Sequence, residues 1–352
     1  MEPAAQPESS HYHYIDAPSP ELYDLAADPG EKENIFSRQP AIASVLKQAL
    51  AQREQTSNPA RRSESSSRLT PEAVAKLRSL GYMAYRLPVT EEQIKVGLAD
   101  PKTKIAEFND ILRATDLFHL GRYQEGTALL EPVRQSDPKM YLVPFMMGEA
   151  ALQQQAWQTA RQQLEASLKL NPTFDQAMTG LAKAYFELNN IEGARGWLKK
   201  ALAENPANFR AWYELGLVES KASLPDAVNA FQQTIKIQPN FAPAYLDAGM
   251  LLYGNHQYAA AVPYLEKAGK LGAATAASWN NLGVCYSQSG KPAAAIRSYK
   301  KALELDPNLA PAHLNLGFAY QQVKKTAAAS SEYASACKLD QQFCKYAAPT
   351  SR

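Results

Sequence analysis

The sequence predicts an all-α fold, a stack of helical hairpins, over the last two thirds of its 352 residues. One observation is a fixed period: five prolines lie 34, 34, 33 and 68 residues apart, and each follows Asn, Asp or Gln. These are Pro138, Pro172, Pro206, Pro239 and Pro307. Because proline ends one helix and starts the next, the period marks a repeating helical unit.

Small residues recur in the same phase between these prolines. Gly or Ala at such positions lets the two helices of a hairpin approach closely, where a larger side chain would separate them. The first set is Gly148, Ala182, Gly216, Gly249, Gly283 and Gly317, and the second is Ala160, Ala194, Ala227, Ala261, Ala295 and Ala329. Two helices per unit explain both sets.

Counting outward from these positions gives seven units within a repeat region at 100–343. The units are 107–140, 141–174, 175–208, 209–241, 242–275, 276–309 and 310–343. The fourth unit is one residue short in the turn near Leu224 and Pro225. Gly126 replaces the small alanine of the first unit, and the fifth unit ends without Asn-Pro.

The unit at 276–309 resembles the tetratricopeptide repeat, whose pattern is W-x2-L-G-x2-Y, then A-x3-F, then P. The matching residues are Trp279, Leu282, Gly283, Tyr286, Ala295, Tyr299 and Pro307. The resemblance implies a right-handed superhelical solenoid, whose concave face is lined by the first helix of each pair and binds peptide segments.

Residues 1–55 have a different, turn-rich texture and no 34-residue phase. His11 to Ile15 and Glu21 to Leu25 have strand character, a turn follows at 28–30, and Pro40 to Gln55 reads as an amphipathic helix. We expect residues 56–99 to be a linker with a short helix, including a Ser/Arg-rich stretch to Arg68, and 344–352 to be a tail.

The run from Glu21 to Ile35 resembles the C-terminal end of a type I sulfatase, which commonly carries such an ELYDL..DP.E..N sequence. Leu69–Glu72 and Leu77–Tyr82 are similar to a segment that often follows it in bacterial members. The resemblance implies a small α+β segment that packs on a missing core. The family's Cys/Ser-x-Pro-x-Arg nucleophile motif does not occur in this chain, so we expect no enzymatic activity and no cofactor.

Composition excludes several classes of function. The chain has 37 basic and 35 acidic residues, and neither part is polarised, so a nucleic-acid partner is not expected. The longest apolar run, Met140 to Gly148, is about half a membrane span, so no membrane insertion is expected. No secretory signal is visible in residues 1–20. The sequence leaves the compartment open: periplasmic or secreted within an exported sulfatase, otherwise cytoplasmic.

Other candidate chemistry is sparse. His11 and His13, with Asp16, could ligate a metal, but a half-exposed strand explains the alternation without one, and we expect no metal site. Cys337 and Cys344 could form a disulfide if the protein is exported. The favoured interpretation is two free thiols, because helix-end geometry decides bridging and the sequence does not show it.

The predicted binding site is the concave groove of the repeats. Aligning the units places these residues on it: Phe145, Glu149, Lys183, Tyr213, Met250, Tyr253, Asn281, Val284, Asn315 and Phe318. A carboxylate clamp like that of chaperone adaptors is not expected, because the equivalent positions include Ile111, Thr115 and Met146.

Asn281 and Asn315 fall where repeats of O-linked N-acetylglucosamine transferase carry an asparagine ladder that grips peptide backbone. Only two rungs are present, preceded by Glu214 and Asp247, and the alternative is that Asn simply fills the position beside Leu-Gly.

The leading hypothesis is a non-catalytic scaffold that binds a protein or peptide ligand in this groove. Because the repeats are nearly balanced in charge, we expect the affinity to depend weakly on salt. The alternative is the regulatory or substrate-recruiting part of a sulfatase whose catalytic core is missing from this chain. The last repeat lacks a capping helix, and an exposed apolar face expected around Phe343 and Tyr346 also suggests self-association through that end.

Overall fold

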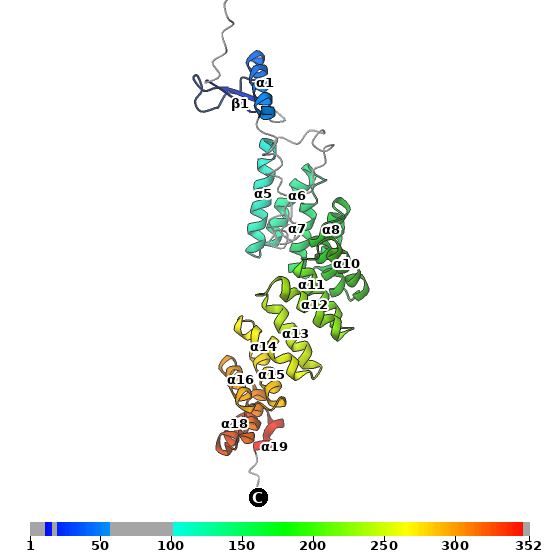
Figure 1. Ribbon diagram of the computed structural model, residues 1–352, viewed down its shortest axis with the longest axis vertical. Coiled ribbons are helices and arrows are strands. Elements are labelled where there is room, and N and C mark those ends of the chain that lie inside the picture. Colours follow the sequence, from blue (N-terminus) through cyan, green and yellow to red (C-terminus); the bar gives the residue numbers. More distant parts are fainter. Residues whose placement is uncertain (1–10, 16–19, 57–100, 348–352) are drawn as a thin grey trace, which may run out of the picture. The chain divides into compact units, whose positions relative to one another are not determined.

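The computed structural model describes residues 11–15, 20–56 and 101–347 (Figure 1). The chain divides into two compact units, Met1–Lys139 and Met140–Arg352, so the first predicted repeat groups with the N-terminal segment. Asp16, most of the predicted linker at 56–99, both sulfatase-like stretches beyond Arg68, and residues 348–352 lie outside the described residues. Within the described ranges, each helix is too short or too polar to span a bilayer.

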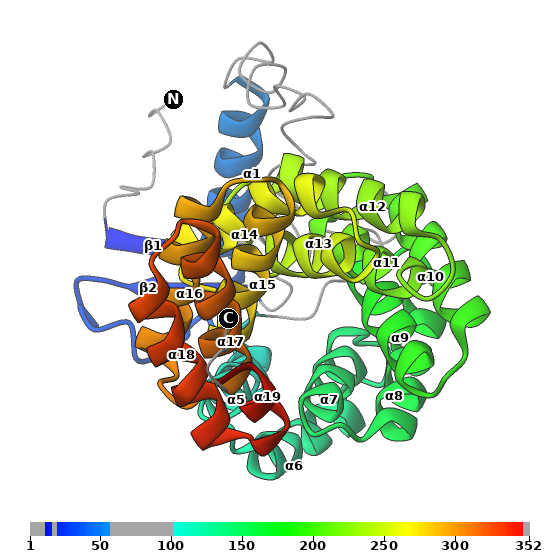
Figure 2. The same ribbon diagram turned by 90° about the horizontal axis from the view of Figure 1, so that it is seen from below.

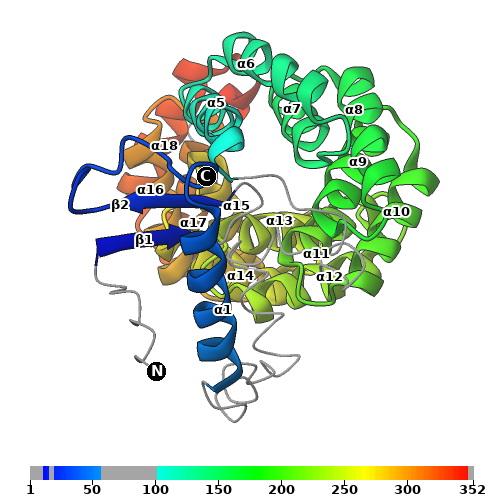
Figure 3. The ribbon, with the colours of Figure 1, turned by 90° about the horizontal axis from the view of Figure 1, so that it is seen from above.

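The first unit contains a two-stranded antiparallel sheet, as the sequence predicts (Figure 3). Strands β1 (Tyr12–Ile15) and β2 (Glu21–Asp24) pair with Tyr12 opposite Asp24, and helix α1 (Pro40–Thr56) follows. Leu22 is fully buried, and its backbone N–H donates to Asn34 Oδ1 at 3.1 Å. Of the two histidines considered as possible metal ligands, His13 has its Nδ1 2.8 Å from Glu31 Oε1.

Seven helical hairpins follow between residues 101 and 347, and their two-helix pattern confirms the repeat prediction. In the first unit α5 (Pro101–His119) pairs with α6 (Tyr123–Ser136), and α5 begins six residues before the predicted start at Glu107. In the second unit the pairs are α7 (Leu142–Gln153) with α8 (Trp157–Leu170), α9 (Asp175–Glu187) with α10 (Ile191–Glu204), α11 (Phe209–Glu219) with α12 (Leu224–Ile237), α13 (Ala242–Gly254) with α14 (Tyr258–Lys270), α15 (Ala276–Gln288) with α16 (Pro292–Leu305), and α17 (Ala310–Gln322) with α18 (Thr326–Leu339).

Five hairpins of the second unit close where a glycine of the first helix meets a large side chain of the second. A Cβ added to Gly216 would lie 2.6 Å from Phe231 Cε1, and one on Gly249 would lie 2.7 Å from Leu265 Cγ. Gly283 likewise faces the ring of Tyr299. Glycine is therefore required at these positions by the close approach of the two helices.

The turn within most hairpins contains one residue in the left-handed backbone conformation. These residues, with φ between 57° and 74°, are Gly121, Gln155, Asn189, His256, Gly290 and Lys324. In the described turn between α11 and α12, within the repeat that is one residue short, no residue adopts this conformation. Four of these six turn residues carry a side chain, although the left-handed backbone conformation is disfavoured for residues other than glycine.

The proline turns between repeats are closed by the fourth residue of the following unit. Trp212 Nε1 donates to the carbonyl oxygen of Pro206 at 2.9 Å, and Tyr245 Oη donates to that of Pro239 at 3.1 Å. His313 Nε2 lies 3.0 Å from the corresponding oxygen of Pro307. This contact gives one histidine of the repeats a structural role.

The first helices of the second unit form its inner side. Consecutive first helices contact one another, as α7 does with α9, α9 with α11, and α15 with α17. Figure 2 shows α7 to α18 following a curved path with the first helices on the inside. This inner side of the second unit is the concave face that the sequence predicts.

The C-terminal cysteines are bonded, contrary to the favoured interpretation of two free thiols. After α18, a turn at Gln341–Phe343 leads into the short helix α19 (Cys344–Ala347) and returns Cys344 toward α18. The Cα atoms of Cys337 and Cys344 are then 4.3 Å apart, joined through a disulfide. Tyr346 of α19 packs on Phe318 with ring centroids 5.3 Å apart, so α19 partly covers the last repeat.

We expect Gly283→Leu to destabilise the second unit by about 1 to 3 kcal/mol, because the new side chain would force the ring of Tyr299 away. Gly196→Leu on α10 is the matched control, since nothing lies within 4 Å of a Cβ there. Hydrogen exchange should rise first in the repeats next to Gly283. Unchanged melting and exchange in the Gly283 variant would contradict the packing described above.

Candidate functional site

The residues predicted to line the groove all lie on the first helices of the second unit. The helix α7 carries Phe145 and Glu149, α9 carries Lys183, α11 carries Tyr213, α13 carries Met250 and Tyr253, α15 carries Asn281 and Val284, and α17 carries Asn315 and Phe318. The prediction is wrong for Phe145, whose side chain is only 9% exposed. Its ring packs edge-on against Phe174 in the core, with the ring centroids 4.7 Å apart. Its ring is not available to a ligand.

The aromatic groove residues differ in how firmly the protein already holds them. Tyr213 donates through Oη to Asp247 Oδ2 at 2.7 Å, and its ring packs against Phe241 at 5.1 Å. Tyr253 packs against Tyr258 at 6.0 Å. Phe318 of α17, which packs on Tyr346 of α19, is 37% exposed and is the most accessible ring of this group. Tyr213 is therefore a structural link between α11 and α13 more than a free anchor.

The two predicted asparagine rungs are connected to neighbouring repeats. Asn315 Nδ2 donates to Asn280 Oδ1 at 3.0 Å, Asn280 Nδ2 donates to Asn281 Oδ1 at 3.4 Å, and Asn281 Nδ2 lies 3.5 Å from Met250 Sδ. Asn280, which sequence reasoning missed, is the buried centre of this chain of amides. Val284 is half-buried and packs on the core of the sixth and seventh repeats.

Carboxylates gather on the inner side of the second to fifth repeats. Burial raises the pKa of Glu149 above its ordinary value, and burial raises that of Glu214 to about 7. The positive charge of Lys183 opposes both shifts, whereas Glu187, Glu149 and Asp247 add to the shift of Glu214. Burial also raises the pKa of Asp247, against the hydrogen bond from Tyr213.

Sequence reasoning noted Glu214 and Asp247 only as residues preceding the asparagines. They occupy the sixth position of consecutive repeats, 33 residues apart, and this recurrence of acidic residues in the sequence could have identified them.

Elsewhere in the second unit a buried carboxylate has a direct partner. Arg195 of α10 donates through Nε to Glu219 Oε1 at 2.6 Å and through Nη2 to Oε2 at 3.1 Å. Such a two-point pair compensates the cost of burying the charge. In the described part of the chain, neither Glu149 nor Glu214 has a hydrogen bond or an ion pair within 4 Å.

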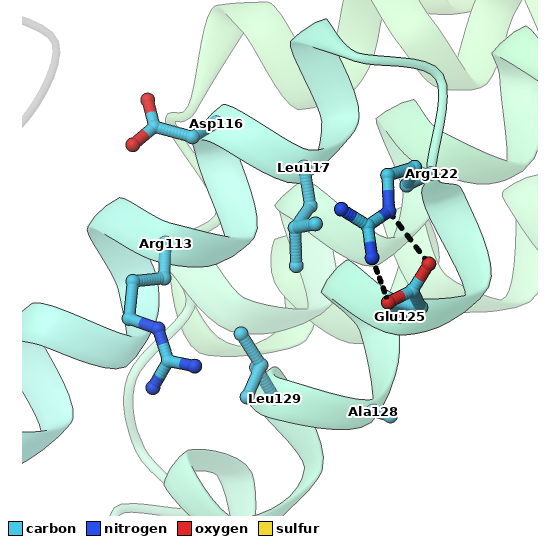
Figure 4. A pocket seen from close by; sticks show the side chains of 7 residues that line it. All are labelled: Arg113, Asp116, Leu117, Arg122, Glu125, Ala128 and Leu129. Atoms are coloured by element: carbon cyan, nitrogen blue, oxygen red, sulfur yellow. Dashed lines mark hydrogen bonds and ion pairs between the residues drawn. The ribbon is translucent and has the colours of Figure 1, made fainter.

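The first unit has a cavity of about 500 Å³ between α5 and α6. Leu117, Ala128 and Leu129 form its apolar wall, and Arg122 donates through Nε to Glu125 Oε1 at 2.7 Å (Figure 4). Arg113 and Asp116 complete the lining. No residue of the predicted groove lines this cavity, and its two arginines are exposed.

The raised pKa of Glu214 predicts a pH-dependent stability. A carboxyl group with a raised pKa in the folded state contributes most below its unfolded pKa, and that contribution is lost as pH rises through about 7. We expect the free energy of unfolding to fall between pH 5 and 8, and Glu214→Gln to reduce this fall by about 1 to 3 kcal/mol. Urea unfolding at both pH values measures it, with Glu204→Gln, an exposed carboxylate of α10, as the control. An identical pH dependence in Glu214→Gln would contradict the environment described for this carboxylate.

Comparison with known proteins identifies the hairpins. Models of the tetratricopeptide repeat match residues 111–173, 151–216, 276–309 and 298–329. A stretch of 109 residues is 28% identical to anaphase-promoting complex subunit 3 of Schizosaccharomyces pombe. That match covers 31% of this chain and spans only 16% of the length of the relative.

Solved structures share the fold. The C-terminal part of a TPR repeat-containing protein from Cytophaga hutchinsonii is similar with a TM-score of 0.54 and 14% identity, over 67% of this chain and 98% of that one. PilF of Pseudomonas aeruginosa is similar with a TM-score of 0.52 and 16% identity, over 62% and 97% of the two chains. The hairpins, their period and the family models agree that residues 111–216 and 276–329 carry tetratricopeptide repeats, and the solved structures share this fold.

Proposed function

We propose that the inner face of the second unit binds an extended peptide segment of a protein partner, and that the chain acts as a non-catalytic scaffold. The observation that carries the proposal is a continuous row of half-buried, chemically varied side chains along six consecutive first helices. These side chains are not needed to close the hairpins, which small residues on another side of the same helices already do. Tetratricopeptide repeats generally mediate interactions between proteins.

Two kinds of contact are available to a peptide on this face. Phe318 and the half-buried Met250 offer apolar surface, which contributes affinity when a partner side chain covers it. Asn281 and Asn315 each keep part of their amide hydrogen-bonding capacity beyond the bonds that link α13, α15 and α17. An amide both donates and accepts, so it can pair with a peptide unit whatever the side chain.

The alternative, that this chain is the regulatory or substrate-recruiting part of a sulfatase, stays a prediction from the run Glu21–Ile35. The described strands and helix of the first unit fit a small accessory sheet, and no catalytic role is assigned to them. Reading the coding sequence upstream of Met1 for a Cys/Ser-x-Pro-x-Arg motif tests this alternative directly.

Peptides selected from a displayed 12-residue library on the full chain test the proposed groove. We expect Met250→Ala with Phe318→Ala to weaken a selected peptide by roughly 5- to 100-fold, which corresponds to about 1 to 3 kcal/mol. Isothermal titration calorimetry measures the dissociation constants, and circular dichroism confirms that the variant is folded.

The matched control is Leu305→Ala, which removes an apolar side chain that is 53% exposed on the second helix α16. It should leave the affinity unchanged. Equal affinity of the wild type and the Met250, Phe318 variant would move the binding surface away from the inner face.

A further inference from the structure

We propose that the disulfide between Cys337 and Cys344 is a redox-sensitive latch that closes the C-terminal end of the repeats. In the oxidised chain the bond holds α19 on the last hairpin, and a dithiol reductant releases α19. The latch concerns the stability of the last repeat and does not depend on the proposed peptide binding. Three features of the chain support it: the register of α19, the positions of the two cysteines, and the weakness of every other contact that holds α19.

The helix α19 begins where an eighth repeat would begin, since Cys344 lies 34 residues after the first residue of α17. The turn before α19 also reproduces the turn before α17. Phe343 N–H donates to the carbonyl oxygen of Asp340 at 3.0 Å, and Leu309 N–H donates in the same way to that of Asp306 at 3.2 Å. In both turns Oδ1 of the aspartate accepts from the N–H two residues later, at 3.0 Å. The chain therefore enters α19 as it enters a first helix.

The bond replaces an apolar contact that other repeats make at the same place. Cys337 of α18 lies 34 residues after Leu303 of α16, which belongs to the apolar cluster that includes Leu316 of the next first helix. The residues that align with Leu303 in earlier repeats belong to similar clusters: Leu168, Leu202 and Ile235. In the seventh repeat a cysteine stands at this position and is bonded to the first residue of the following helix.

Little else holds α19 in place. Among the described residues 341–347 none is buried, whereas α17 buries five residues. Tyr346 lies 34 residues after the fully buried Ala312, but it is 38% exposed and meets the hairpin through the edge-on contact with Phe318. A helix of four residues is far below the length that is stable in water without other contacts. The disulfide is therefore the strongest link between α19 and the hairpin.

The bond is accessible to a reductant, because Cys337 and Cys344 are both half-buried. The first thiolate of a dithiol attacks one of the two sulfur atoms and expels the other as a thiolate, and the second thiolate then displaces the protein sulfur. The two cysteines gain two electrons and two protons, and the dithiol becomes a cyclic disulfide. Oxidising surroundings therefore keep the latch closed, whereas a pool of reduced dithiols opens it.

Hydrogen exchange of the full chain, purified under air and then compared with and without dithiothreitol, tests the latch. We expect the reductant to raise exchange in residues 336–347 by about 10-fold, with a smaller rise in α17 and none in α7 to α10, because repeats couple mainly to their neighbours. Alkylation of the chain purified under air, unfolded in urea without reductant, should modify one cysteine, the free Cys285.

The variant Cys337→Ser with Cys344→Ser should exchange like the reduced wild type and should not respond to dithiothreitol. Its matched control is Cys285→Ala, which removes a buried thiol outside the latch and should keep the full response. Tyr346→Ala should raise exchange in residues 336–347 less than reduction does, because the bond still holds α19.

Three results would overturn the latch. The first is equal exchange of residues 336–347 in the oxidised and reduced chain, and the second is alkylation of all three cysteines in the chain purified under air. The third is a larger rise of exchange in Tyr346→Ala than on reduction, which would assign the hold on α19 to the packing of the rings.

Discussion

The close approach of two helices inside each hairpin is the constraint on which the rest of this structure depends. At Gly216 and Gly283 the second helix places an aromatic side chain, Phe231 or Tyr299, directly against the backbone of the first helix. At Gly148 and Gly249 the facing side chain is a leucine, Leu164 or Leu265, so the facing residue varies in size while the glycine is shared. A larger residue at the glycine position would not fit, because protein interiors are close-packed.

The contact inside each hairpin uses one side of the first helix and leaves its inner side out of the packing between the two helices. The hairpin contacts and the contacts with the preceding hairpin occupy two sides of each first helix, and the residues on the inner side vary in type from repeat to repeat. At the sixth position of consecutive repeats it carries Met146, Gly180, Glu214, Asp247, Asn281 and Asn315. Specificity can therefore reside in a few inner residues, while the 34-residue period preserves the scaffold around them.

The sequence predicts the hairpins well because the residues that recur with the 34-residue period are proline, glycine and alanine, whose effects on the backbone and on helix packing are local. The inner face is harder to read. Phe145 occupies a groove position by alignment, yet its ring turns into the core beside Phe174, a choice made by tertiary packing. The disulfide between Cys337 and Cys344 depends on a turn after α18 that brings Cys344 back to Cys337, seven residues earlier in the chain. The place of Asn280 in the chain of amides depends on a contact between neighbouring repeats, which the spacing of residues in the sequence does not predict.

The same limit applies to charge, because a count over the whole chain does not say where the charges lie. A count over the chain gives a formal net charge of +2, yet the solenoid sorts its charges by position: the acidic residues Glu214 and Asp247 face inward in consecutive repeats, while pairs such as Lys301 with Glu304 neutralise each other on an outer helix. Neutralised pairs on the outer side contribute little to binding or stability. Among the described residues, Glu214 has no ion pair of that kind, whereas Asp247 accepts the hydrogen bond from Tyr213 that links α11 to α13, so the charges of the inner side are held differently from the paired charges of the outer helices.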